Sequence, residues 1–109
     1  METSQGNTPF TSIEGLPTDI PILSENNGDL MKTVSQEMTM YYFTSRLSVK
    51  EVADFYLAGM AENGWEVMSE TTQADMYYWV FMKGDTRQVM ITTASNGETS
   101  TVSIIVEET

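Results

Sequence analysis

The sequence contains no cysteine and no histidine among its 109 residues. Without cysteine it has no thiol nucleophile and no disulfide, and without both residues it lacks the usual ligands of zinc. The absence of histidine also removes the commonest general acid–base group. Serine and threonine are plentiful, but no phosphate-binding glycine loop and no Gly-x-Ser-x-Gly motif accompanies them. We therefore expect no catalytic residues, no metal and no cofactor, and we do not expect an enzyme.

Positive charge is also scarce. Five lysines and arginines stand against 16 aspartates and glutamates, so the formal net charge is −11. Such scattered cations do not form a basic patch that binds nucleic acid or an anionic lipid surface. No apolar run is long enough for a transmembrane helix, and the N-terminal sequence METSQGNTPF lacks the basic and apolar regions of a signal peptide.

The first 28 residues are rich in Thr, Ser, Gly, Asn and Pro and show neither helical nor strand periodicity. This composition is typical of an extended segment. We interpret residues 1–16 as a flexible tether and residues 17–109 as a single domain, because the length fits one core. Apolar side chains are available to dock the start of the domain on that core: Leu16, Ile20, Ile22 and Leu23.

Periodicity predicts one helix, at residues 48–64. Ser48 and Glu51 have the spacing of a capping box, and apolar residues follow at intervals of three and four. Strands are predicted at residues 30–36, 38–45, 65–72, 76–83, 87–94 and 100–107, with turns between them. The order β-β-α-β-β-β-β predicts an α+β fold, in which one antiparallel sheet carries one helix on one of its faces.

Most of these strands have one strongly apolar face, which we assign to the core beneath the helix. Val102, Ile104 and Val106 share such a face. The stretch DMYYWVFMK, residues 75–83, differs because its apolar side chains alternate onto both faces. A helix is about 10 Å across whereas six strands span about 24 Å, so one helix cannot contact the second face of the sheet.

We therefore expect a band of methionine and aromatic side chains on the second face, including the row of Tyr77, Trp79 and Phe81. Three alternatives stay open: the band is ordinary core because the N-terminal segment folds back or the sheet curls, it is an interface with another chain, or it is a groove for an apolar ligand. The sequence leaves open whether residues 38–45 bury Met40 and Tyr42 or Tyr41 and Phe43. The candidate binding or interface residues are Met68, Tyr77, Trp79, Phe81, Met90 and Ile105.

Several short motifs resemble a small domain of uncharacterised bacterial secreted proteins and lipoproteins. They are Pro17-x-Asp19-Ile20-Pro21, Tyr42-x-Thr44, Ser48-x-x-Glu51-Val52-x-x-Phe55-Tyr56, Asn63-Gly64-Trp65 and Lys83-Gly84. The resemblance covers residues 17–107 and implies an extracytoplasmic domain on a flexible tether, without assigned catalysis or functional residues. This chain departs from the pattern because it has no lipid-attachment cysteine, so we expect any targeting segment to lie outside this sequence.

Together these features predict a non-catalytic interaction or binding module of a bacterial envelope protein, self-associating through the second face of the sheet. The alternative is a carrier that holds a small apolar or lipidic ligand between the helix and a curled sheet. The expected partners are accordingly a second copy, another protein or a small apolar ligand. Nucleic acid and membrane insertion of this chain are not expected.

Overall fold

The fold is known from a computed structural model that describes residues 13, 15–73, 75–84, 86–95, 97 and 99–108. The elements follow in the order β1 (Met31–Val34), β2 (Met38–Ser45), α1 (Val49–Glu62), β3 (Glu66–Gln73), β4 (Met76–Lys83), β5 (Arg87–Ser95) and β6 (Ser100–Glu108). The predicted α+β fold, with its element order, is therefore confirmed. In the part of the chain described here, no helix is long and apolar enough to cross a membrane.

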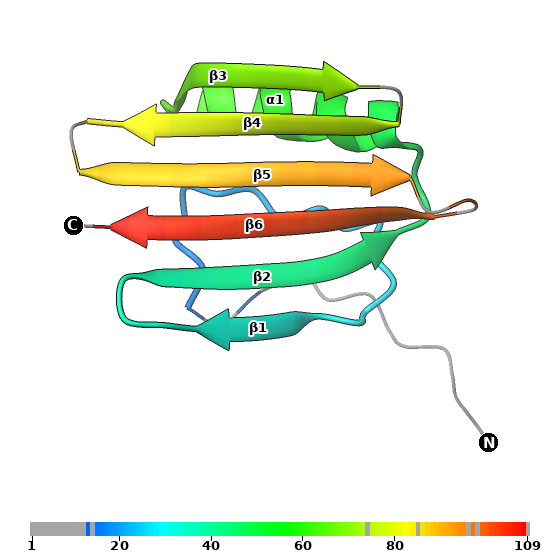
Figure 1. Ribbon diagram of the computed structural model, residues 1–109, viewed down its shortest axis with the longest axis horizontal. Helices are drawn as coiled ribbons and strands as arrows, with labels where there is room; N and C mark the ends of the chain where they lie inside the picture. Colours follow the sequence, from blue (N-terminus) through cyan, green and yellow to red (C-terminus); the bar gives the residue numbers. More distant parts are fainter. Residues whose placement is uncertain are drawn as a thin grey trace.

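All six strands form one antiparallel sheet in the order β1-β2-β6-β5-β4-β3 (Figure 1). Strands β3 to β6 form a meander with short turns. The last strand, β6, then lies beside β2, which comes before the helix in the chain. This long-range pairing joins the N-terminal hairpin β1–β2 to the meander and leaves β1 and β3 at the two edges.

The helix begins and ends close to where its sequence predicts. The Ser48 hydroxyl accepts from the backbone N–H of Glu51 at 3.2 Å, and the Glu51 carboxylate accepts from the backbone N–H of Ser48 at 3.2 Å, which is the predicted capping box. One face of α1 is buried against β4 and β5. Its buried residues are Val52, Ala53, Tyr56 and Met60.

A second segment shares the covered side of the sheet with the helix. Figure 1 shows α1 behind β3 and β4, while the chain N-terminal to β1 runs behind β5, β6 and β2. We call residues 15–30 the strap. Ile20 and Leu23 of the strap are each 2% exposed, so the prediction that these residues dock on the core is confirmed. One helix is too narrow for this sheet, and the strap covers the area that the helix leaves.

The strap and the helix approach each other closely at Gly59. A methyl group added to Gly59 would lie 2.8 Å from Cγ of Pro21, which is closer than carbon atoms normally approach. The glycine therefore lets the proline ring lie against the helix. The other end of the strap is bonded to β2, where Asp29 accepts from both the backbone N–H and the hydroxyl of Thr44 at 3.0 and 2.8 Å.

The boundary predicted between tether and domain lies near a residue that contacts the core. Ile13, inside the predicted tether, is only 6% exposed and belongs to the core cluster. Its carbonyl accepts from the backbone N–H of Leu16 at 3.2 Å. The tether prediction for residues 1–12 falls outside the described residues, and the boundary at residue 17 stays a prediction.

Candidate functional site

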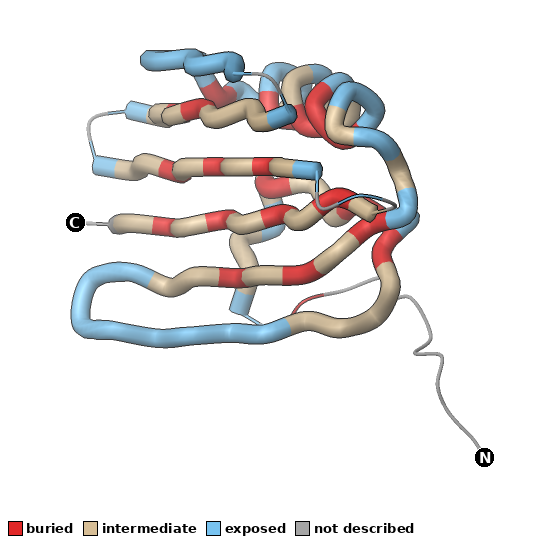
Figure 2. The backbone as a smooth tube through the Cα atoms, turned by 45° about the vertical axis from the view of Figure 1, so that its right-hand side comes forward, coloured by how far each residue is buried: buried red, intermediate tan, exposed pale blue. Residues whose placement is uncertain are grey.

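The strand register assigns each paired strand residue to one of two faces, because directly paired residues share a face. Trp79 pairs with Ile91, and Ile91 pairs with Ile104, which in turn pairs with Tyr41. All four are 0–1% exposed and lie beneath the helix and the strap. Figure 2 shows the resulting alternation of buried and half-buried residues along β5 and β6.

This register corrects the expected position of the aromatic row of β4. Tyr77, Trp79 and Phe81 lie on the covered face and not on the second face. Trp79 is fully buried, and its indole N–H donates to the Glu70 carboxylate at 3.0 Å. Its ring stacks on Tyr77 at a centroid distance of 5.8 Å. Trp79 and Phe81 are core residues and Tyr77 is partly buried against that core, so the expected role of the row in binding has no support from its position.

The other three candidate residues lie elsewhere. Met90 and Ile105 are paired on the face opposite the helix, and both are half-buried. Met68 is 58% exposed on the edge strand β3, at a break in the register between Val67 and Ser69. The six candidates therefore do not form one surface. The question left open for β2 is also answered, because Tyr41 and Phe43 are buried whereas Met40 and Tyr42 lie on the opposite face.

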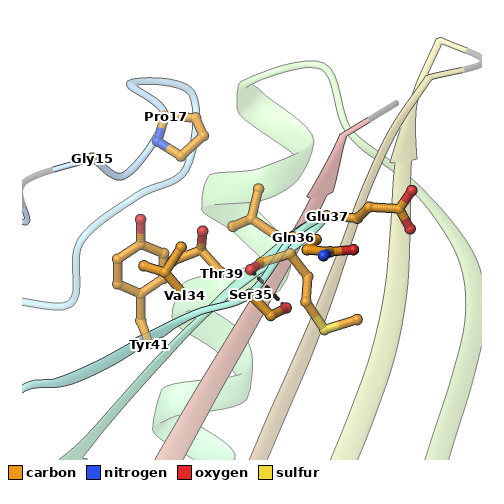
Figure 3. A pocket seen from close by; sticks show the side chains of 10 residues that line it. Gly15, Pro17, Val34, Ser35, Gln36, Glu37, Thr39 and Tyr41 are labelled. Atoms are coloured by element: carbon orange, nitrogen blue, oxygen red, sulfur yellow. Dashed lines mark hydrogen bonds between the residues drawn. The ribbon is translucent and has the colours of Figure 1, made fainter.

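A pocket of about 350 Å³ lies at the end of the covered face, between the strap and the β1–β2 hairpin. We call it the hairpin pocket. Figure 3 shows Pro17 and Gly15 on one side, with the hairpin residues Val34 to Thr39 across from them. The turn is closed by Ser35, whose N–H donates to the Met38 carbonyl at 2.9 Å. The lining residues are Gly15, Pro17, Val34, Ser35, Gln36, Glu37, Met38, Thr39, Tyr41 and Val106.

The inner wall of this pocket combines apolar and polar groups. Tyr41 is 1% exposed, and burial raises the pKa of its hydroxyl. The ammonium of Lys32 lies 5.7 Å from the centre of the Tyr41 ring. Gly15 has a φ of +86°, and a methyl group on it would lie 2.7 Å from that ammonium. Glycine is therefore required where the strap passes Lys32 and Tyr41.

A cluster around Asp19 fixes the strap beyond the pocket. The Asp19 carboxylate is bonded to Lys83 at 2.8 Å and to Arg87, whose second guanidinium nitrogen donates at 3.0 Å. Its backbone carbonyl accepts from the Asn63 amide and the Trp65 indole, at 3.0 and 2.9 Å. The Arg87 guanidinium holds the pKa of Asp19 at about 2, against 3.8 ordinarily, with Lys83 assisting and burial opposing. The carboxylate is ionised at neutral pH.

The face opposite the helix, which we call the open face, has a different composition. Among the described residues, no segment lies over it (Figure 1). One row across four neighbouring strands is entirely apolar, and we call it the central stripe: Met40, Ile105, Met90 and Val80. The next row contains Tyr42 and Tyr78, and the Tyr78 hydroxyl contacts the Met90 sulfur at 3.3 Å.

The fold and the pocket together define a class of protein, a small α+β domain with a cavity between one sheet and its cover. A family model described as START domain-like matches residues 23–108, and the chain belongs to this family. The match spans the hairpin, the helix and the meander. No curated protein and no solved structure matches the chain.

The sequence indicated neither the hairpin pocket nor the Asp19 cluster as a site. The tip of the hairpin, Ser35 to Glu37, reads as a short polar break between two strands. Asp19, Asn63, Trp65 and Lys83 all occur in the motifs of the resemblance, and the structure brings them together. Their occurrence in these motifs was the available signal, but the contacts of the cluster, including those of Arg87, span 20 to 68 residues of chain and follow no local pattern.

Proposed function

We propose that this domain is a non-catalytic module that binds a small molecule with apolar and polar parts in the hairpin pocket. Membership of the START domain-like family supports the proposal, since such domains are typically ligand-binding and not catalytic. The carrier function inferred from the sequence is the closer of the two expected functions. The lack of cysteine and histidine agrees with a binding role, because the usual groups for acid–base or nucleophilic chemistry are missing.

The observation that carries the proposal is the hairpin pocket. Its volume of about 350 Å³ lies within the range of about 300–1,000 Å³ that is usual for small-molecule sites. Val34 and Pro17 supply apolar surface, while Ser35, Gln36 and Glu37 supply polar groups at the hairpin tip. This distribution favours a molecule that has both apolar and polar groups, with its polar groups facing the hairpin tip.

The expected position of the ligand, between the helix and the sheet, needs a refinement. The side chains beneath the helix fill that space, since Tyr56, Met60 and Trp79 are all 0% exposed. The hairpin pocket instead lies where the strap, and not the helix, is the second layer. Because the Asp19 cluster anchors the strap a few residues from Pro17, we propose that the site is largely formed before a ligand binds.

A matched pair of variants tests the proposal. The probe is the neutral fluorophore N-phenylnaphthylamine, because an anionic probe would be repelled by a chain of charge −11. Val34 is 67% exposed at the pocket, and Val67 is 48% exposed on β3. We expect Val34→Trp to weaken probe binding by about tenfold or more, since the indole blocks the pocket, while Val67→Trp leaves it unchanged.

Equal affinities of the two variants and the unsubstituted chain would contradict the proposal. Native mass spectrometry of freshly purified protein supplies an independent measurement. A retained small molecule that is lost in Val34→Trp but kept in Val67→Trp supports the pocket as the site. A retained molecule that is kept in both variants counts against it.

A second candidate function is an interaction module that self-associates. The observation in its favour is the open face, on which apolar side chains form a continuous row. The extracytoplasmic, envelope location also stays a proposal, and it is supported only by the motif resemblance. Fractionation of bacteria that express the natural gene tests it, and recovery of the protein in the cytoplasmic fraction would rule the location out.

A further inference from the structure

We propose that the open face is the interface of a homodimer, in which the two sheets pack face to face about a two-fold axis that runs across the strands. This inference rests on the second candidate function and not on the hairpin pocket. The pocket opens between the strap and the β1–β2 hairpin at the end of the covered face and shares only Met38 with the four rows of the open face, so the two proposals are tested separately. Four observations carry the inference: the row pattern, the charge distribution, the area and the side-chain chemistry.

The register arranges the open face in four rows that run across the strands. The first contains Met38, Glu107, Gln88, Met82 and Glu66, and the second is the central stripe with Thr33 and Ser69. The third contains Met31, Tyr42, Ser103, Thr92, Tyr78 and Thr71. The fourth contains Thr44, Thr101, Ala94, Met76 and Gln73. The apolar side chains thus gather in the middle of the face, where the centre of an interface is normally found.

Charge is nearly absent from this face, although the chain as a whole is strongly acidic. Among the residues in the four rows, only Glu66 and Glu107 are charged, and both lie in the first row. There is no lysine or arginine in these rows, so the face offers no positive charge for an acidic partner, and its two carboxylates lie at one edge. A second copy of the chain provides another surface that is largely uncharged and apolar at its centre.

The position of the two carboxylates selects one arrangement of the dimer. A two-fold axis parallel to the strands would place the glutamate row of one copy on that of the other. An axis across the strands instead places the glutamate row of one copy over the fourth row of the other copy, which is uncharged. The first and fourth rows are about 20 Å apart, because each row step is two residues or about 6.8 Å. This distance exceeds the screening length of about 8 Å at physiological ionic strength.

The available area is sufficient for a specific interface. Six strands at about 4.8 Å and eight residues at about 3.4 Å give a face of about 24 by 27 Å. Two such faces bury roughly 1,300 Å², which lies within the range of about 1,200–2,000 Å² for stable complexes. Methionine and tyrosine are enriched at interface centres, and methionine adapts its shape to the opposing surface.

Sedimentation equilibrium over a hundredfold range of concentration tests the dimer. We expect the unsubstituted chain to dimerise and Ile105→Glu, in the central stripe, to weaken dimerisation by about a hundredfold, because it buries an unpaired carboxylate. Thr92→Glu is a second variant at a position that is already polar. Val67→Glu is the matched control, since Val67 is exposed and lies outside the four rows.

Fluorescence of Trp65 and Trp79, which are both buried on the covered side, reports whether each variant is folded. A folded Ile105→Glu or Thr92→Glu monomer beside a dimeric Val67→Glu control supports the interface. An unsubstituted chain that stays monomeric throughout overturns it, and so does a Val67→Glu variant that dissociates as readily as Ile105→Glu. Neither result affects the ligand proposal, which the fluorescent probe tests through Val34 at the hairpin pocket.

Discussion

The two faces of the sheet are made by the same six strands, yet they differ in what their side chains contact. On the covered face, large aromatic and branched residues are fully buried by the helix and the strap, as Trp79 and Ile91 show. On the open face, most methionine, threonine and tyrosine side chains are half-buried, and those near its edges, such as Met31 and Met38, are exposed. The apolar character of a strand therefore does not tell which of its faces carries the core. The difference lies in the kind of apolar residue and in the layer above it.

The sharpest test of this comparison uses two adjacent residues of β4. Trp79 and Tyr78 are both large aromatic residues, but one is fully buried and the other half-buried on the open face. We expect Trp79→Ser to lower the free energy of unfolding by about 3–5 kcal/mol, because it leaves a large cavity in the core. Tyr78→Ser should cost about 1 kcal/mol in the monomer. Urea denaturation measures both, and similar losses would contradict the assignment of the faces.

The second test concerns the attachment of the strap, without which part of the covered face would be exposed. Asp19 has a pKa of about 2 in the folded protein against 3.8 ordinarily, so folding favours its ionised form. Its contribution is present above pH 3.8 and is lost as the pH falls toward 2. We expect Asp19→Asn to cost about 1–2 kcal/mol at neutral pH, a value reduced for partial solvent exposure of the ion pairs.

The same variant should flatten the pH dependence of stability between pH 5 and pH 2, because it lacks the Asp19 carboxylate, whose pKa folding lowers to about 2. Urea titrations at several pH values measure this. Lys50→Ala removes an exposed ion pair with Asp54 on the helix and serves as the control, for which we expect little change. An unchanged pH profile in Asp19→Asn would contradict the assigned role of the cluster.

The third and smallest test addresses the contact between strap and helix. Alanine is a better helix former than glycine by about 1 kcal/mol, so Gly59→Ala would stabilise an isolated helix. Here we expect a net loss of about 1 kcal/mol, because the added methyl group meets the rigid ring of Pro21. Thermal denaturation of Gly59→Ala, of Pro21→Ala and of the double variant measures it. The double variant should regain stability relative to Gly59→Ala.

The sequence predicted the elements well, because their signals are local. The capping box at Ser48, the helical spacing of Val52, Tyr56 and Met60, and the alternation in β5 and β6 all depend on near neighbours. The face of β4 was predicted wrongly because both of its rows are apolar, so alternation alone did not distinguish them. Its assignment depends on the pairing of Lys83 with Arg87, which sets Trp79 opposite Ile91.

The hairpin pocket and the Asp19 cluster were not predictable for a different reason. Each is formed by segments far apart in the sequence, such as Pro17 with Val34 and Asp19 with Arg87. Their proximity follows from the path of the strap across the covered face, and the strap has no sequence periodicity from which that path could be predicted. The presence of apolar residues in the strap indicated that it docks, but not where it lies relative to the strands.

The methionines of the open face have a chemical consequence. Six of the nine methionines in the chain lie in its four rows, whereas Met60 is fully buried beneath the helix. Peroxide oxidises an accessible thioether to a polar sulfoxide, and reductase enzymes reverse this change. In a monomer, oxidation would therefore turn the open face from apolar to polar, while Met60 in the core stays intact.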